Sequence, residues 1–183
     1  MADQVPPGRT AVLVIDLQTA MFDGVLTPPL HDADGLVARV RQILDWARAS
    51  DRKIAFIRHE ETEGEPLAKG AAGWPVWPAL GQAEGEPTFP KSVGDAFSEP
   101  MLGVWLKSLE ADSVILLGAQ TDFCVAATVQ GALAHGLAVT VVSDAHSTWE
   151  SGGETAEAII ARHNATFAAA GVKVVATDGL LAG

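Results

Sequence analysis

The sequence predicts an α/β protein of three layers (α/β/α), in which a six-stranded, mainly parallel sheet lies between two layers of helices. Short runs of apolar, often β-branched residues alternate along the chain with longer segments of helical periodicity. Several of these runs are apolar at every position, which is typical of strands that a parallel sheet buries on both faces. No break in composition divides the 183 residues, so we expect a single domain that spans residues 1–183.

The first half of the chain is expected to contain two strands, one helix and a long loop. Residues Thr10 to Ile15 and Lys53 to Ile57 are the two apolar runs with strand character. Asp34 can cap the helix between them, whose apolar stripe consists of Leu36, Val40, Ile43, Leu44 and Ala47. Residues 60–86 are rich in Gly and Pro but also contain two Trp residues. Because tryptophan argues against disorder, we expect a long, irregular loop of functional importance here.

The second half continues the alternation of strands and helices. Thr88 to Lys91 is expected to be an edge strand, because Pro90 has no N–H to donate to a neighbouring strand. Ser98 is expected to cap the next helix, with Pro100 in its first turn. The remaining expected elements are a strand (Ser113 to Leu117), a helix that Gly136 ends, a strand (Ala138 to Val142), a helix (Glu154 to Ala170), a strand (Val172 to Val175) and a short tail (Asp178 to Gly183).

Composition and charge exclude several classes of partner. The chain has 12 Lys and Arg against 23 Asp and Glu, a formal net charge of −11, which speaks against nucleic acid and anionic membranes. No apolar run is long enough to cross a bilayer. A single cysteine fits a reducing compartment, and Met1 to Arg9 lack the pattern of a signal peptide. We therefore expect a cytoplasmic protein that acts on a small molecule.

Reactive side chains are found where the predicted strands end. Asp16, His59, Lys91 and Cys124 each lie at, or shortly after, the carboxyl end of a predicted strand. Ligands of open parallel sheets bind beyond these strand ends, near the point where the strand order reverses. The four side chains are therefore expected to share one rim of the sheet.

Cys124 is expected to lie in the first turn of a helix that Thr121 or Asp122 caps. The positive end of the helix dipole would then favour the thiolate over the thiol. Considered alone, each residue also has a structural reading. Cys124 could be a buried packing residue, Asp16 a turn cap and Lys91 a surface lysine. Only their combination points to nucleophilic catalysis.

A carboxylate, an ammonium and a thiol on one rim would form a coherent nucleophilic site. Asp16 can accept the thiol proton and later return it to a leaving group. Lys91 can hold the thiolate that forms. Backbone N–H groups at the start of the helix are suited to the oxyanion that arises when a thiolate adds to a carbonyl group.

These residues also resemble a known family. Asp16 after an apolar strand, Lys91 within Phe-Pro-Lys-Ser, and Gly-Ala-Gln-Thr-Asp-Phe-Cys-Val at residues 118–125 are similar to the motifs of the isochorismatase-like cysteine hydrolases. That superfamily includes nicotinamidases, N-carbamoylsarcosine amidases and streptothricin hydrolase-like enzymes. The resemblance extends through Ser143 to His146 and therefore covers nearly the whole chain.

The resemblance implies a catalytic triad of Asp16, Lys91 and Cys124 in a three-layer fold. It also implies a cis peptide bond between Ala119 and Gln120, which directs the Gln120 N–H, beside that of Cys124, toward the oxyanion. Members of the superfamily form oligomers, so a homodimer or homotetramer is expected.

The metal site of the nicotinamidases is not reproduced in the sequence. Those enzymes bind a metal through an Asp-x-His element after the second strand and a further histidine downstream. The corresponding stretch here is Ile57-Arg58-His59, and no second histidine follows in the loop. We therefore expect neither a metal nor another cofactor.

Aromatic residues in the loops above the rim are candidates for the walls of a substrate pocket. We expect Phe22, His59, Trp74 and Trp149 to line it, with Trp77 and Phe97 as further candidates. Packing between a loop and the core, or across a subunit interface, is the alternative for each of them.

Three functions are compatible with these features. The presence of Cys124 favours hydrolysis of a small-molecule amide or lactam through a thioester intermediate. The first alternative is hydrolysis of a vinyl ether, as by isochorismatases, with Asp16 as the acid and Cys124 as a bystander. The second is a non-catalytic, flavodoxin-like binding module. It would need a phosphate-binding turn after the first strand, where Asp16 would repel the anion.

Overall fold

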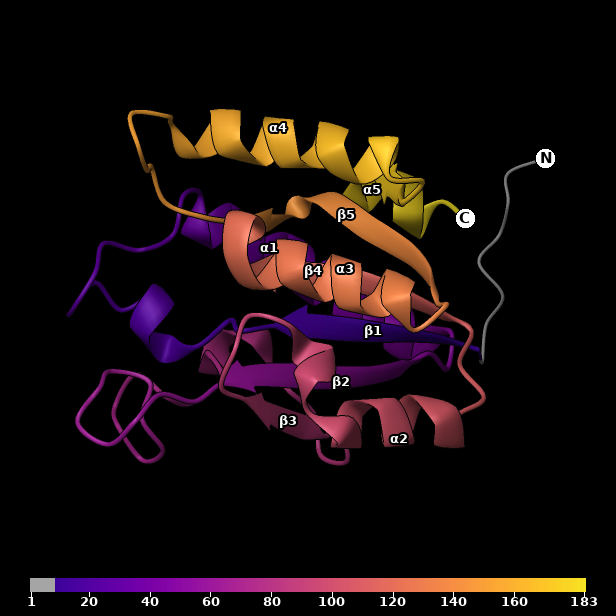
Figure 1. The fold of residues 1–183 in the computed structure, drawn as a ribbon, viewed down its shortest axis with the longest axis horizontal. Coiled ribbons are helices and arrows are strands. Elements are labelled where there is room, and N and C mark those ends of the chain that lie inside the picture. The colour runs from indigo at the N-terminus through magenta and orange to yellow at the C-terminus, as the bar shows by residue number, and fades with distance from the viewer. Residues whose placement is uncertain (1–8) are drawn as a thin grey trace.

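The computed structural model describes residues 9–183, so the expectation about a signal peptide lies largely outside the described residues. Six parallel strands form one sheet in the order β3-β2-β1-β4-β5-β6 (Figure 1). The strands are β1 (Thr10–Ile15), β2 (Lys53–His59), β3 (Thr88–Lys91), β4 (Ser113–Ala119), β5 (Ala138–Ser147) and β6 (Lys173–Val175). The predicted six-stranded sheet is confirmed.

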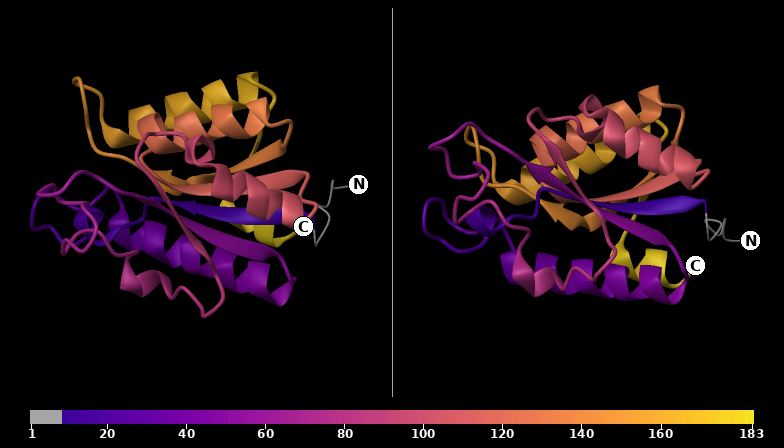
Figure 2. Two further views of the ribbon diagram at one scale, coloured as in Figure 1. Left: turned by 60° about the horizontal axis from the view of Figure 1, so that its bottom comes forward. Right: turned by 90° about the horizontal axis from the view of Figure 1, so that it is seen from below.

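Helices cover both faces of the sheet (Figures 1 and 2). The helices are α1 (Ala33–Ala49), α2 (Pro100–Ser108), α3 (Ala126–Ala134), α4 (Ala156–Ala169) and the short α5 (Thr177–Leu181). Val12 and Val14 of β1 pack in one apolar cluster with α1 and α5, whereas Leu13 and Ile15 pack in the other with α2 and α3. Because β1 is buried at all six positions, its uniformly apolar sequence is explained.

The strand order reverses between β1 and β4. From β1 the chain proceeds outward to β2 and β3, and then returns to build β4, β5 and β6 on the other side of β1. In Figure 1 the loops after β1, β2 and β5 extend from the same end of the sheet. This is the position where open α/β sheets bind their ligands.

Gly118 brings β1 and β4 into close contact at this reversal. Its φ angle is +131°, and a Cβ atom there would lie 2.1 Å from the carbonyl oxygen of Ile15. Only glycine lets the backbones approach this closely. As a result, the residue after Ile15 and the turn after β4 meet at one point of the rim.

The caps of two helices differ from the prediction. Asp32, not Asp34, precedes α1, and Glu99, not Ser98, precedes α2. Ser98 instead ends a short 3₁₀ turn, η3 (Ala96–Ser98), and its hydroxyl donates to the carbonyl of Asp95. In neither α1 nor α2 does the cap side chain bind a backbone N–H, so propensity for capping could not locate these helix starts.

Strand and tail lengths also differ. β5 continues five residues beyond the predicted Val142, because Gly118 and Ala119 pair with His146 and Ser147 after an irregularity in the register. The predicted tail contains α5, whose Leu180 is buried in the core. No helix among residues 9–183 has both the length and the apolar composition needed to span a membrane.

The long loop, residues 60–86, is attached to the segment that follows β1. Thr19 N–H donates to the carbonyl of Pro75, and Trp77 N–H donates to the carbonyl of Leu17, both at 2.9 Å. A β-bridge pairs Gln18 with Val76 in antiparallel orientation. The loop is therefore ordered, and it lies over the end of β1 in its own chain.

Candidate active site

Strand register places the charged residues of the site beside one another. His59 and Lys91 are direct partners in the pairing of β2 with β3. Asp16 follows β1 and turns sharply, with a φ angle of 50°, while its N–H binds the carbonyl of Ile57. Cys124 lies in a single π-helical turn, η4 (Thr121–Val125), that follows β4.

The ammonium of Lys91 is the centre of the site. Its Nζ lies 2.6 Å from Oδ2 of Asp16, and both side chains are fully buried. The same Nζ lies 3.2 Å from Sγ of Cys124 and 3.2 Å from Nδ1 of His59. A fourth contact, at 3.0 Å, is made to the carbonyl oxygen of Val93. The structure therefore brings together all four residues of the predicted rim.

Burial decides the protonation state of Cys124. Desolvation raises the pKa of its thiol to about 12, and the adjacent carboxylate of Asp16 acts in the same direction. The positive charge of Lys91 lowers the pKa but does not compensate for these two effects. The expectation that the helix start would favour a resting thiolate is therefore wrong: at neutral pH the sulfur carries its proton until a base removes it.

The prediction that Thr121 or Asp122 caps the helical turn containing Cys124 is also wrong. Gln120 precedes η4, and no side chain caps that turn. Thr121 and Asp122, the predicted caps, face other partners. Thr121 Oγ1 lies 2.8 Å from Nδ1 of His146, and Asp122 accepts a hydrogen bond of 2.6 Å from Thr148.

His146 supports the turn that carries Cys124. Its Nε2 lies 2.9 Å from Oδ1 of Asn164, whose amide nitrogen donates to the carbonyl of Ser143. This arrangement places the imidazole proton on Nε2, so that Nδ1 accepts from the hydroxyl of Thr121. Burial lowers the pKa of His146 to about 4, which keeps the ring neutral.

His59 is held in place through its backbone. Gln18, which is fully buried, accepts from the N–H of His59 at 2.9 Å and donates to its carbonyl at 3.0 Å. The same amide nitrogen donates to the carbonyl of Trp74 at 2.9 Å.

Sequence reasoning missed both Gln18 and His146. Gln18 follows Asp16 by two residues and His146 lies near the end of β5, so proximity to a strand end is the signal that points to them.

The segment before Cys124 has a defined backbone geometry. The peptide bond between Ala119 and Gln120 is cis. The carbonyl of Gln120 accepts from the N–H groups of Phe123 and Val125 at 3.2 Å and 3.0 Å. These contacts tie both sides of Cys124 to the residue at the cis bond.

The aromatic residues predicted to line a pocket differ in their surroundings. Phe22 is buried and stacks on Trp77, with ring centres 5.3 Å apart. Trp149 is partly buried and donates through Nε1 to the carbonyl of Pro28 at 2.8 Å. Trp74 has the guanidinium of Arg58 3.5 Å above its ring. Their contact with a substrate stays a prediction.

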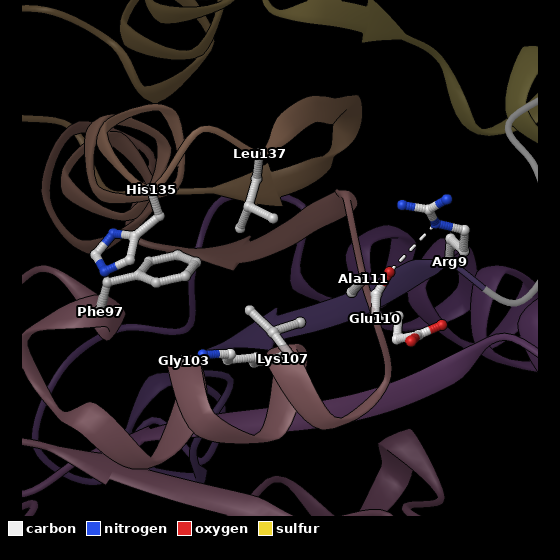
Figure 3. Close-up of a pocket in the computed structure, with 9 residues that line it drawn as sticks. Arg9, Phe97, Gly103, Lys107, Glu110, Ala111, His135 and Leu137 are labelled. Atoms are coloured by element: carbon white, nitrogen blue, oxygen red, sulfur yellow. Dashed lines mark hydrogen bonds between the residues drawn. The ribbon is translucent and has the colours of Figure 1, made fainter.

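A hollow of about 720 Å³ lies between α2 and α3, near the residues that precede β1, β4 and β5 (Figure 3). Its lining includes Phe97, whose ring lies tilted against that of His135, with ring centres 4.8 Å apart. Two of its polar groups are already paired. Arg9 binds the carbonyl of Glu110, and Nδ1 of His135 lies 2.8 Å from the carbonyl of Gly131. None of the residues that contact the Lys91 ammonium lines this hollow.

Metal ligation can be judged from the same geometry. Ligand atoms of Asp16, His59 and Cys124 lie within 4.8 Å of one another, a spacing that a metal ion would accept. However, the ammonium of Lys91 contacts all three of these side chains. Asp16, His59 and Cys124 are therefore arranged around the ammonium of Lys91, which supplies the positive charge that a metal ion would otherwise provide.

A doubly wound sheet with a buried Asp–Lys pair against a cysteine defines the class of protein: a hydrolase-like α/β fold with its site at the strand reversal. Comparison with known proteins agrees. A family profile described as "Isochorismatase domain" matches residues 10–178. The chain belongs to the isochorismatase family of hydrolases, which leaves the non-catalytic binding module without support.

Individual relatives support this assignment. Streptothricin hydrolase of Streptomyces noursei is 33% identical over 143 residues, which are 76% of this chain and 55% of that protein. A protein from Oleispira antarctica classed as an isochorismatase hydrolase superposes with a TM-score of 0.89 and 26% identity, covering 98% of this chain and 99% of that one. An isochorismatase from Pseudomonas putida has a TM-score of 0.82 and 27% identity, covering 96% and 93%. The chain spans about half the length of the curated streptothricin hydrolases that it matches.

Proposed function

We propose that this chain hydrolyses the C–N bond of a small-molecule amide or lactam, other than a peptide, through a thioester on Cys124. The observation that carries the proposal is the contact of one buried ammonium with both a carboxylate and a sulfur. Lys91 Nζ lies 2.6 Å from Asp16 and 3.2 Å from Cys124. A base, a nucleophile and a fixed positive charge are the groups that acyl transfer to a thiol requires.

In the first half-reaction, Asp16 takes the proton of the Cys124 thiol and the sulfur adds to the substrate carbonyl. A C–S bond forms, and the electron pair of the C=O bond moves to oxygen. We propose the backbone N–H groups of Gln120 and Cys124 as the oxyanion hole. When the adduct collapses, the C–N bond breaks and Asp16 donates its proton to the departing nitrogen.

In the second half-reaction, water hydrolyses the thioester. Asp16, again a carboxylate, takes a proton from water as the oxygen attacks the acyl carbon. The C–S bond then breaks, and the sulfur regains its proton from Asp16. Lys91 stabilises the sulfur whenever it carries negative charge, and no step requires a metal or another cofactor.

Hydrolysis of a vinyl ether is less well supported by the surroundings of Arg58. A dianionic substrate of that type calls for arginine, and Arg58, which precedes His59 at the end of β2, is the candidate. Its guanidinium lies on the ring of Trp74, and it also lies 3.3 Å from Oε1 of Glu60. Because Glu60 already balances its charge, Arg58 is poorly suited to bind an additional carboxylate.

The test is a screen of small amides with mass detection of an acyl group on Cys124. Nicotinamide, carbamoyl amino acids, simple lactams and streptothricin form the panel, and isochorismate is included for the alternative. We expect a Cys124 adduct with at least one amide, and complete loss of its turnover in the Cys124→Ala variant. A folded Cys124→Ala protein that still hydrolyses a verified substrate would reject the covalent mechanism.

A further inference from the structure

Lys91 is surrounded by more acceptors than it has N–H groups. An ammonium has three donors. Hydrogen bonds of good geometry run to Val93, His59 and Cys124, at 3.0, 3.2 and 3.2 Å. The carboxylate of Asp16 lies nearest, at 2.6 Å. Yet both of its oxygens are buried, and within residues 9–183 neither has a hydrogen bond of good geometry.

This shortage has a chemical consequence for Asp16. A buried carboxylate without a well-aligned donor has lone pairs free to accept a proton, while the ammonium of Lys91, 2.6 Å away, balances its charge. Besides the Lys91 ammonium, the thiol of Cys124 can give a proton to this carboxylate, since its sulfur lies within 4.8 Å of a carboxylate oxygen of Asp16. After that transfer, the three N–H groups of Lys91 face three acceptors: the thiolate, the carbonyl of Val93 and the imidazole of His59.

We propose that His59 is a positioning residue that favours transfer of the Cys124 proton to Asp16, by occupying the N–H of Lys91 that the carboxylate would otherwise bind. This inference rests on the proposed function and adds His59 to its machinery. In the step, the S–H bond breaks and an O–H bond forms on Asp16, while Lys91 keeps all three of its protons. His59 itself neither gains nor loses a proton.

His59 is suited to this role because its acceptor atom, Nδ1, is held in place and its ring stays neutral. Gln18 binds both the N–H and the carbonyl of the His59 backbone, so the ring is presented from a rigid strand end. Since the ammonium donates to Nδ1, the ring proton lies on Nε2. Burial, and next the charge of Lys91, lower the pKa of His59, whereas Asp16 and Glu61, the acidic groups that face it, act in the opposite direction.

The experiment compares His59→Leu with His59→Asn. Leu and Asn have nearly the same shape, but only Asn places an oxygen atom near the position of Nδ1. The readout is the rate of alkylation by iodoacetamide at pH 7 and its pH profile. Cys124 is the only cysteine in the chain, so the reaction reports on one thiol. A cooperative unfolding transition in urea is required of both variants, as the control that they are folded.

We expect the His59→Leu variant to react about tenfold more slowly than wild type at pH 7, which corresponds to one pKa unit at Cys124. The His59→Asn variant should react at nearly the wild-type rate. Equal rates in the two variants, or faster alkylation of the Leu variant, would overturn the proposal. Should His59→Leu not fold, His59→Met, which also lacks a strong acceptor, takes its place in the comparison.

Alkylation needs no substrate, so this test can fail independently of the proposed function. Turnover retained in Cys124→Ala would reject the covalent mechanism whatever the alkylation rates are. Equal alkylation of the Leu and Asn variants, together with an inactive Cys124→Ala, would remove only the role given to His59.

Discussion

Replacing Lys91 by Met tests the ion pair on which the site is built. Met retains most of the aliphatic stem and removes the ammonium, so Asp16 is left as a buried carboxylate without its counter-ion. Both side chains have 0% exposure and lie 2.6 Å apart. Breaking such a pair from one side typically costs about 3–5 kcal/mol. That is a large fraction of the roughly 5–15 kcal/mol by which domains are stable.

The assay is the free energy of unfolding in urea at pH 7 for wild type, Lys91→Met and the double variant Asp16→Asn/Lys91→Met. We expect the double variant to be more stable than Lys91→Met, because it removes the uncompensated charge. Lys53→Met is the matched control. Its ion pair with Asp51 is of similar length, 2.8 Å, but exposed, so little change is expected.

Two results would refute the reasoning. One is a Lys91→Met variant as stable as Lys53→Met, which would mean that the buried carboxylate needs no counter-ion. The other is a double variant that is no more stable than Lys91→Met, since the loss would then come from packing of the lysine stem rather than from charge.

Three further outcomes are expected. Gly118→Ala should lose at least about 3 kcal/mol of stability in urea, since its Cβ would lie 2.1 Å from a backbone oxygen of β1; Gly64→Ala, also at positive φ but with no atom within 4 Å, should lose far less. Because the pKa of His146 is about 4 when folded and about 6.5 when unfolded, its contribution to stability is lost as pH falls through this range. Between pH 7 and pH 4, the wild type should therefore lose up to about 3 kcal/mol more unfolding free energy than the His146→Gln variant. If the unfolding free energies of the two proteins fall equally with pH, the lowered pKa of His146 is contradicted. Dialysis against a metal chelator should leave the proposed amide hydrolysis unchanged, and activity restored only by added metal would show that Lys91 is not the sole cation of the site.

The sheet could be predicted because its signals are local. Thr10 to Ile15 is apolar at every position, and the structure buries all six residues. The helix caps were less accessible. Asp32 and Glu99 precede α1 and α2 without a side-chain cap, so the preference for capping residues favoured the wrong neighbours, Asp34 and Ser98.

The residues of the site could be identified from the sequence, but the protonation state of the Cys124 thiol could not. A cysteine at the start of a helix suggests a thiolate, and that local rule fails here. Burial and the carboxylate of Asp16, which is 108 positions away in the chain, raise the thiol pKa to about 12. Desolvation depends on everything packed around the sulfur, and no local pattern encodes it.

The sequence by itself therefore determined the layers, the strands and the rim on which the reactive side chains lie, because periodicity and strand ends are properties of neighbouring residues. Only the tertiary structure decided how those side chains share protons. The direct pairing of His59 with Lys91, and the approach of β4 to β1 at Gly118, place four acceptors around one ammonium. That count depends on distances of a few ångströms between segments far apart in the chain, and these distances are set by packing.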